Sequence, residues 1–237
     1  MSGPFDDERI AAGMRAQMEL RRTRFADGAL MVGWKAGFGA PAARQSLRIR
    51  MPLVGFLVDS ALIDTGATVS LEGWRKPIAE AEIAAYIGRD LPANADRETV
   101  RRAIVAIGPA IELIDVDGPM DDVPAILAGD IFQRHVILGR RDIMRSGARL
   151  DGLKARVFQS GKEIVAPADL ETNTGRVHET VAHVADIAAA LGEGLRAGQV
   201  IICGSITPPM FLQPGETGVS YTLEPVGSIS VRFSGGA

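Results

Sequence analysis

The sequence predicts an α+β protein with a mixed or mainly antiparallel β core. Within residues 1–28, apolar side chains recur with helical periodicity. After residue 28, short apolar runs are interrupted by Gly, Pro and Asp about every ten residues. The predicted strands outnumber the predicted helices and do not alternate strictly with them. This order argues against a doubly wound parallel sheet.

The first predicted element is a helix within residues 1–28. Asp6 or Asp7 can cap its N-terminus, and Gly28 can end it. Its apolar residues at or near helical spacing are Ile10, Met14, Met18 and Phe25. Because no linker interrupts the rest of the chain, we expect an N-terminal helical segment, 1–28, followed by one domain, 29–237.

Two more helices and nine strands are predicted in the larger domain. Helix 97–107 would start after Asp96 and stop at Gly108-Pro109, and helix 179–190 would end at Gly192. The predicted strands are 33–38, 54–58, 79–87, 110–116, 135–138, 155–159, 199–204, 218–223 and 227–233.

Composition excludes several classes of protein. The single cysteine, Cys203, cannot form an internal disulfide, so a disulfide-rich secreted scaffold is excluded. A formal net charge of −3 offers no basic footprint for nucleic acid or for a membrane surface. The sequence shows neither a membrane span nor a signal peptide, and we therefore expect a cytoplasmic protein.

Several common catalytic motifs are missing. Gly161-Lys162 lacks the rest of a phosphate-binding loop, and the glycines from Gly37 onward are interrupted by Pro41 before they complete a dinucleotide fingerprint. No G-x-S-x-G sequence is present. The three histidines do not form H-E-x-x-H, and we interpret them as surface or packed residues.

The stretch 77–87 contains two carboxylates, Glu80 and Glu82. On a helix they would point about 200° apart, but on a strand residues i and i+2 face the same side. Glu112 lies thirty residues after Glu82 in an apolar, strand-like run, where an unpaired carboxylate is costly to bury. A divalent cation would compensate all three acids, and all-oxygen ligands favour Mg²⁺ or Mn²⁺ over Zn²⁺. The alternative is a pair of solvated helical glutamates and a Glu112 paired with arginine.

One lysine, Lys35, lies in the apolar and glycine-rich run 31–38, unlike the other three lysines, which lie among polar or turn residues. Buried lysines are rare unless they are paired. Lys35 could supply positive charge for an anionic substrate beside the carboxylates, or it could form a structural ion pair.

These motifs resemble the 2-keto-4-pentenoate hydratase branch of the fumarylacetoacetate hydrolase superfamily. The matching segments are 33–37, 80–91, 109–115, 192–200, 203–207, 214–216 and 227–233. The resemblance implies a mixed β-roll or sandwich with flanking helices and makes 29–237 the catalytic domain. It implies Mg²⁺ or Mn²⁺ bound by Glu80, Glu82 and Glu112, with Lys35 near the substrate and Ser205 and Thr207 lining the site.

The resemblance also implies a reaction: addition of water to a 2-hydroxy-2,4-dienoate, giving a 4-hydroxy-2-oxo acid in aromatic catabolism. The chain departs from the branch at Leu53, where the hydratases carry an aspartate, and Asp130 is our candidate for that role. The alternatives are decarboxylation of a 2-oxo-3-enedioate, hydrolysis of a C–C bond, and a non-catalytic partner of a related subunit. Arg134 is interpreted as a surface residue rather than as a reader of a distal carboxylate. The resemblance further implies a homo-oligomer.

Overall fold

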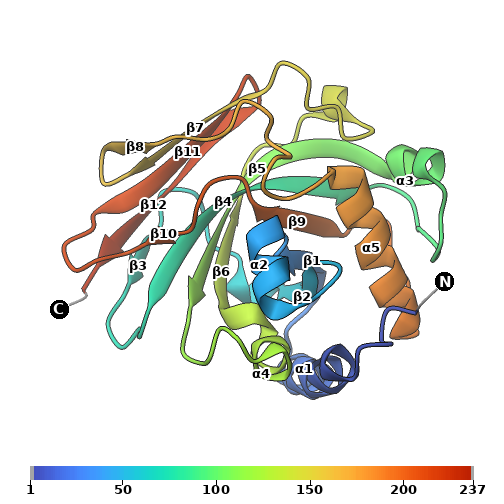
Figure 1. The fold of residues 1–237 in the computed structure, drawn as a ribbon. Helices are drawn as coiled ribbons and strands as arrows, with labels where there is room; N and C mark the ends of the chain where they lie inside the picture. Colours follow the sequence, from blue (N-terminus) through green and yellow to red (C-terminus); the bar gives the residue numbers. More distant parts are fainter. Residues whose placement is uncertain (1–2, 236–237) are drawn as a thin grey trace.

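The computed structural model describes residues 3–235. Residues 1–2 of the predicted N-terminal segment and residues 236–237 of the predicted domain lie outside it. It contains five α-helices and two β-sheets within that range (Figure 1). The helices are α1 (Glu8–Ala26), α2 (Pro41–Leu47), α3 (Arg97–Ala103), α4 (Val123–Ala128) and α5 (Val177–Ala190). The strands are β1 (Met31–Gly37), β2 (Leu53–Val58), β3 (Thr68–Ser70), β4 (Pro77–Ile87), β5 (Ile104–Asp115), β6 (Gln133–Leu138), β7 (Lys154–Gln159), β8 (Lys162–Ile164), β9 (Val200–Ser205), β10 (Met210–Phe211), β11 (Gly218–Glu224) and β12 (Gly227–Ser234).

The larger sheet has the order β2-β1-β9-β4-β5-β6, with β10 paired to β4. Its pairs are antiparallel except for β1 with β9. The segment that follows β2 reaches the opposite edge, where Leu62 pairs with Val136 of β6. The sheet therefore curls until its two edges are joined. Its inner face carries a compact cluster of small and β-branched or leucine side chains: Leu57, Ala84, Ala110, Val136, Val200 and Ile202.

The smaller sheet has the order β3-β12-β11-β7-β8 and packs through β11 and β12 against β5 of the larger sheet. Figure 1 shows it on the side of the molecule away from α1 and α5. Buried apolar residues of both sheets and of α5 form one continuous core. This packing fixes the middle of β4 and β5, the strands that carry the three predicted metal ligands.

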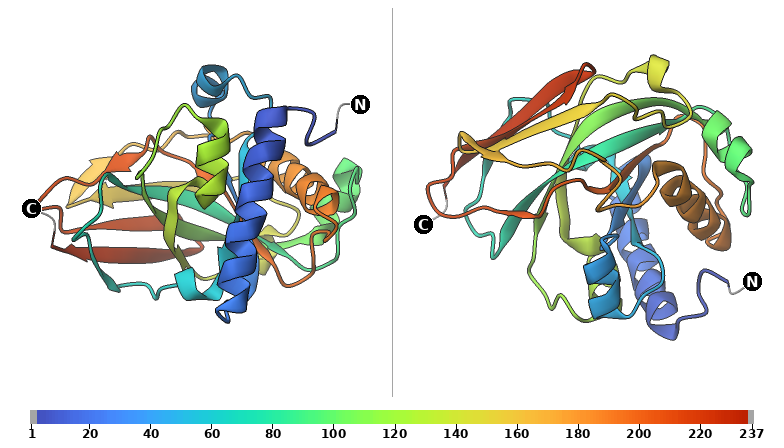
Figure 2. Two further views of the ribbon diagram at one scale, coloured as in Figure 1. Left: turned by 90° about the horizontal axis from the view of Figure 1, so that it is seen from below. Right: turned by 45° about the horizontal axis from the view of Figure 1, so that its top comes forward.

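Helix α1 lies beside α4, as Figure 2 shows. The close approach requires Gly13, because a Cβ there would lie 2.7 Å from the Leu127 side chain. Gln17 of α1 is buried, and its Nε2 donates to the carbonyl oxygens of Val54 in β2 and Leu127 in α4. The N-terminal helix is thus bound to α4, which precedes Asp130 in the chain, and to β2, whose Phe56 N–H contacts Asp130. The described residues contain no helix that is long and apolar enough to cross a bilayer.

The predicted fold class is confirmed: the structure is mixed α+β with curled, mainly antiparallel sheets and flanking helices. Asp7 is the residue that caps α1, and its carboxylate accepts from the Arg9 N–H. Helix α5 starts two residues earlier than predicted.

One predicted helix, 97–107, is wrong in its second half. Helix α3 ends at Ala103, and Ile104 begins β5. The run from Ile104 to Ile107 is rich in β-branched residues, and it pairs with β4, so sheet formation overrides the helical pattern. Gly108-Pro109 lies inside the strand instead of ending a helix.

Candidate functional site

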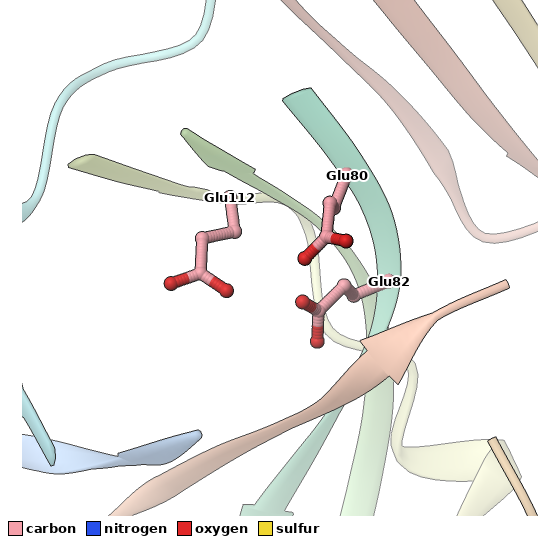
Figure 3. A group of neighbouring side chains, drawn as sticks. All are labelled: Glu80, Glu82 and Glu112. Carbon is pink, nitrogen blue, oxygen red and sulfur yellow. The ribbon is translucent and has the colours of Figure 1, made fainter. Parts of the chain in front are cut away.

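The three predicted metal ligands meet on the inner face of the larger sheet. Glu80 and Glu82 point to the same side of β4, and Glu112 of β5 lies directly opposite Glu80 in the antiparallel register. One ligand atom from each lies within 4.8 Å of the others, and the carboxylates face a common space (Figure 3). The strand interpretation of 77–87 is therefore confirmed, and the helical alternative is wrong.

Glu82 is held by the neighbouring strand β9. Gly204 has a φ of +97°, which few residues other than glycine adopt readily, and its N–H donates to Glu82 Oε2 at 2.6 Å. The other oxygen, Oε1, is buried without a hydrogen-bond partner among residues 3–235. A buried acceptor left in this way is expected to bind a group from outside the chain.

Lys35 is the cation closest to these acids. Its side chain is fully buried, and Nζ donates to Glu112 Oε1 and, at 3.2 Å, to the carbonyl oxygen of Ile131. Burial lowers the pKa of Lys35, but the carboxylates of Glu112, Asp130 and Glu80 outweigh it, so the pKa lies above its usual value. Lys35 is therefore charged at neutral pH.

One lysine does not balance three carboxylates. Burial and repulsion by Glu112 raise the pKa of Glu80 to about 7, and burial with repulsion by Glu112 and Glu80 raises the pKa of Glu82 well above its usual range. Three oxygen ligands with excess negative charge fit a hard divalent cation such as Mg²⁺ or Mn²⁺. Among the described residues, the metal-binding cluster contains these three glutamates and no histidine or cysteine.

Asp130 lies on the other side of Lys35, in a strained turn. Three consecutive residues, Asp130, Ile131 and Phe132, have left-handed φ angles of 53–62°, a conformation that costs energy for non-glycine residues and clusters at functional sites. The Asp130 side chain is fully buried, and its Oδ1 accepts from the Phe56 N–H at 2.9 Å. Burial raises its pKa to about 7, against the opposing effects of Lys35, this N–H and Arg24.

Gly55 of β2 is a site residue that the sequence analysis missed. It pairs with Lys35, and a Cβ at this position would lie 2.6 Å from Asp130 Oδ1 and 2.9 Å from Lys35 Cγ. A glycine inside an apolar strand often marks such a close approach. The run Val54-Gly55-Phe56 therefore carried a signal for this contact.

Gly55→Ala is accordingly expected to displace Lys35 and Asp130 and to lower kcat by about 100-fold, the loss that follows a displacement of about 1 Å in a catalytic group. The measurement is the steady-state rate together with the melting temperature. Gly118→Ala is the matched control, because its Cβ would make an ordinary 3.5 Å contact. Unchanged activity in Gly55→Ala would contradict the close packing of Lys35 and Asp130.

Ser205 is the last residue of β9 and pairs with Glu82 in the strand register, and Thr207 follows it two residues later. Both hydroxyl oxygens are buried and have no hydrogen-bond partner among the described residues. Asn173, from a distant loop, holds this segment by donating from Nδ2 to the carbonyl oxygen of Ile206 at 3.0 Å. Two buried hydroxyls without partners, in a segment that begins opposite Glu82, are suited to bind the oxygens of a polar ligand.

Leu53 shares a face of β2 with Gly55, so it faces the side on which Lys35 and Asp130 lie. Leu53 is buried and apolar, so it cannot act as the aspartate that the hydratases carry at this position. Arg134 is 34% exposed and pairs with Asp117 at 2.7 Å and with Asp115. His183 contacts the carbonyl oxygen of Pro52 and lines, together with Leu53, a cavity between α1 and α5.

The chain resembles known proteins along most of its length. The sequence model of the fumarylacetoacetate (FAA) hydrolase C-terminal family matches residues 34–234. A 2-hydroxyhexa-2,4-dienoate hydratase of Comamonas testosteroni is 29% identical over 92% of this chain and 83% of its own. A 2-keto-4-pentenoate hydratase of Paraburkholderia phymatum is 28% identical over 89% and 81%. A 4-oxalocrotonate decarboxylase of Pseudomonas putida is 26% identical over 98% and 89%.

Two solved structures resemble the fold closely. The 4-oxalocrotonate decarboxylase from Pseudomonas putida G7, complexed with magnesium and adipate, has a TM-score of 0.86 at 25% identity, covering 98% of this chain and 90% of its own. The fumarylpyruvate hydrolase from Pseudomonas aeruginosa, in complex with Mn²⁺ and pyruvate, has a TM-score of 0.66 at 14% identity, covering 85% and 88%. The second likeness concerns the fold alone.

Proposed function

Since this chain belongs to the fumarylacetoacetate hydrolase family, we propose that it is a divalent-metal-dependent hydratase. It adds water to a 2-hydroxy-2,4-dienoate of the 2-keto-4-pentenoate type and gives a 4-hydroxy-2-oxo acid. The observation that carries the proposal is one constellation of largely buried side chains: three glutamates that fit a cation, of which Glu80 is partly exposed, Lys35 beside them, and Asp130 next to Lys35 at Gly55.

A cation held by Glu80, Glu82 and Glu112 would polarise the C2 oxygen of a 2-oxo acid. The charge balance then assigns a task to Lys35. Three carboxylates and one divalent cation sum to −1, so an anionic substrate needs a further positive charge, and the buried ammonium of Lys35 supplies it. Its Nζ also has protons to orient or give to a substrate oxygen.

Asp130 is the general base in this proposal. A carboxyl whose pKa lies near 7 is half ionised at neutral pH, which suits a group that takes a proton from water and later returns it. The enol first becomes a 2-oxo-3-enoate, losing its O–H proton and gaining a proton at C5. One water then adds across the remaining alkene, placing its hydroxyl on C4 and its proton on C3. Ser205 and Thr207 offer free hydroxyls to substrate oxygens.

Decarboxylation of a 2-oxo-3-enedioate is the second candidate. It is favoured by the apolar Leu53 at the position of the hydratases' aspartate, and by the decarboxylase relative that covers 98% of this chain. It needs no water activated at the remote carbon. The intact set of Lys35 and the three glutamates supports catalysis over the role of a non-catalytic partner subunit.

The test is the loss of ultraviolet absorbance of 2-hydroxypentadienoate with and without Mg²⁺, with carbon dioxide release measured from a 2-oxo-3-enedioate. Asp130→Asn is expected to abolish hydration while sparing metal binding and the enol–keto tautomerisation of the substrate. Leu53→Asp, on the Lys35 side of β2, is expected to raise hydration. Carbon dioxide release without any hydration by the parent or Leu53→Asp would transfer the assignment to decarboxylation. Full hydration by Asp130→Asn would remove Asp130 from the mechanism.

The same proposal includes the setting of the enzyme. It would act in aromatic catabolism in the cytoplasm, as a homo-oligomer of a chain that itself contains Lys35, Asp130 and all three metal ligands. Light scattering on the purified protein measures the oligomeric state, and co-purification with a related subunit would contradict the homo-oligomer.

A further inference from the structure

The N-terminal helix places one arginine against the candidate base. Arg24, near the C-terminal end of α1, lies with Nη1 3.5 Å from Asp130 Oδ2. The other oxygen of the same carboxylate, Oδ1, accepts from the Phe56 N–H. The two carboxylate oxygens of Asp130 are thus contacted by two different elements, α1 and β2, that are far from Asp130 in the sequence.

The position of Arg24 is fixed by its surroundings. Its guanidinium carbon lies 5.2 Å from the centroid of the Phe56 ring, the residue whose N–H binds Asp130. Gln17, two turns earlier on α1, is bonded to β2 and to α4, and α4 leads directly into the turn that carries Asp130. Helix, strand and turn therefore hold the guanidinium and the carboxylate in one arrangement.

Arg24 also connects the buried acid to solvent. Its side chain is 28% exposed, whereas Asp130 is 0% exposed. It lines a cavity of about 560 Å³ between the end of α1, the turn after β2 and the start of β6. Gln133, which lines the same cavity, is buried and has both amide atoms unpartnered among residues 3–235. A polar wall of this kind is suited to ordered water, which would hydrate the outer side of the guanidinium.

We propose that Arg24 is a positioning residue for Asp130: the N-terminal helix, through this guanidinium, holds the carboxylate in its proton-accepting orientation and charge state. The inference rests on the proposed function for its catalytic consequence. A guanidinium is always charged, and its planar donors fix the direction of a carboxylate. Because Arg24 lies on the outer side of Asp130, it acts on the substrate only through that acid.

Other charges around Asp130 do not replace it. Lys35 of β1 lies on the inner side and is shared with Glu112 of β5 and the carbonyl oxygen of Ile131. Arg21 of α1 is buried among aromatic rings and is paired with Glu193. Among the described residues, Arg24 is the arginine whose guanidinium lies within 4 Å of the Asp130 carboxylate. Arg21 attracts Asp130 without forming an ion pair with it, so removal of Arg24 leaves Oδ2 without a direct cationic contact on the outer side.

The variant Arg24→Met tests the inference, with Arg24→Lys as the conservative change. Arg22→Met is the matched control, because Arg22 lies on the same helix, is exposed and pairs with Glu19. We expect Arg24→Met to raise the pH midpoint of the Asp130 carboxyl carbon in ¹³C NMR by about 0.5–1 unit. This shift corresponds to an ionisation constant that is about three- to tenfold smaller. The assignment of this signal comes from Asp130→Asn.

In kinetics, Arg24→Met should lower kcat for hydration about two- to sixfold near neutral pH, the fall in the ionised fraction of Asp130 expected from that shift, and leave KM and tautomerisation within twofold. Arg24→Lys should restore part of the rate, and Arg22→Met should behave like the parent. An unchanged NMR midpoint, or a rate loss that only follows a lower melting temperature, would overturn the inference. A shifted midpoint in a protein that performs no hydration would leave the placement of Asp130 standing and refute the proposed function.

Discussion

Replacing Glu82 by glutamine is expected to abolish the Mg²⁺-dependent activity and to leave the fold intact. The amide oxygen of glutamine can still accept from the Gly204 N–H, which now donates to Glu82 Oε2, so the strand contact survives. The charged ligand for the cation is lost. The same outcome is expected for Glu80→Gln and Glu112→Gln, and titration calorimetry with Mg²⁺ or Mn²⁺ measures the loss of binding directly.

The metal-free protein offers an independent measurement. Burial and neighbouring carboxylates raise the pKa of Glu82 above its value in the unfolded chain. A carboxyl with a raised folded pKa loses native stability as pH rises from the unfolded value through the folded one, because ionisation is then resisted only in the native state. Glutamine does not titrate. The melting temperature of metal-free Glu82→Gln should therefore exceed that of the metal-free parent, and more so near about pH 8 than near about pH 5. Mn²⁺-soaked crystals without anomalous signal among the three glutamates would contradict the metal site.

Much of the site was predictable because strand periodicity is local. Glu80 and Glu82 are two residues apart, so one face of one strand suffices to bring them together. Glu112 is predicted less directly, since only the register of β4 and β5 places it opposite Glu80. A carboxylate inside an apolar strand was the signal that made this partner plausible.

The remainder depended on tertiary contacts that no local pattern encodes. Arg24 reaches Asp130 across 106 residues, and its own surroundings on the helix resemble an ordinary surface. The left-handed turn from Asp130 to Phe132 contains no glycine, the residue that would have indicated this backbone conformation in the sequence. The predicted helix 97–107 is too long for the same reason. Pairing of β5 with β4 makes its second half a strand, although the local sequence pattern favours a helix. Short helices such as α2 and α4 were missed because six or seven residues carry little periodicity.

Lys35→Met is expected to lower activity by about 10²–10⁴-fold, the range for a positioned acid–base group. Methionine keeps most of the length of the side chain and removes the charge together with the donors to Glu112 and to the carbonyl oxygen of Ile131. The loss should appear in kcat, since the ammonium acts on charge that develops during the reaction. Lys76→Met is the control, because Lys76 is exposed and its ammonium lies over the Phe211 ring instead of among the site carboxylates.

Stability measurements separate this role from a structural one. In the metal-free protein, Lys35→Met leaves Glu112 buried without its cation, and breaking a buried pair costs about 3–5 kcal/mol. With Mg²⁺ bound, the cation compensates the same carboxylate, so the melting temperature of the Mg²⁺-loaded variant should return close to that of the loaded parent. The activity should nevertheless remain low. A loaded variant that is both inactive and strongly destabilised would instead identify Lys35 as a structural residue, and a loaded variant with parental activity would remove it from the reaction.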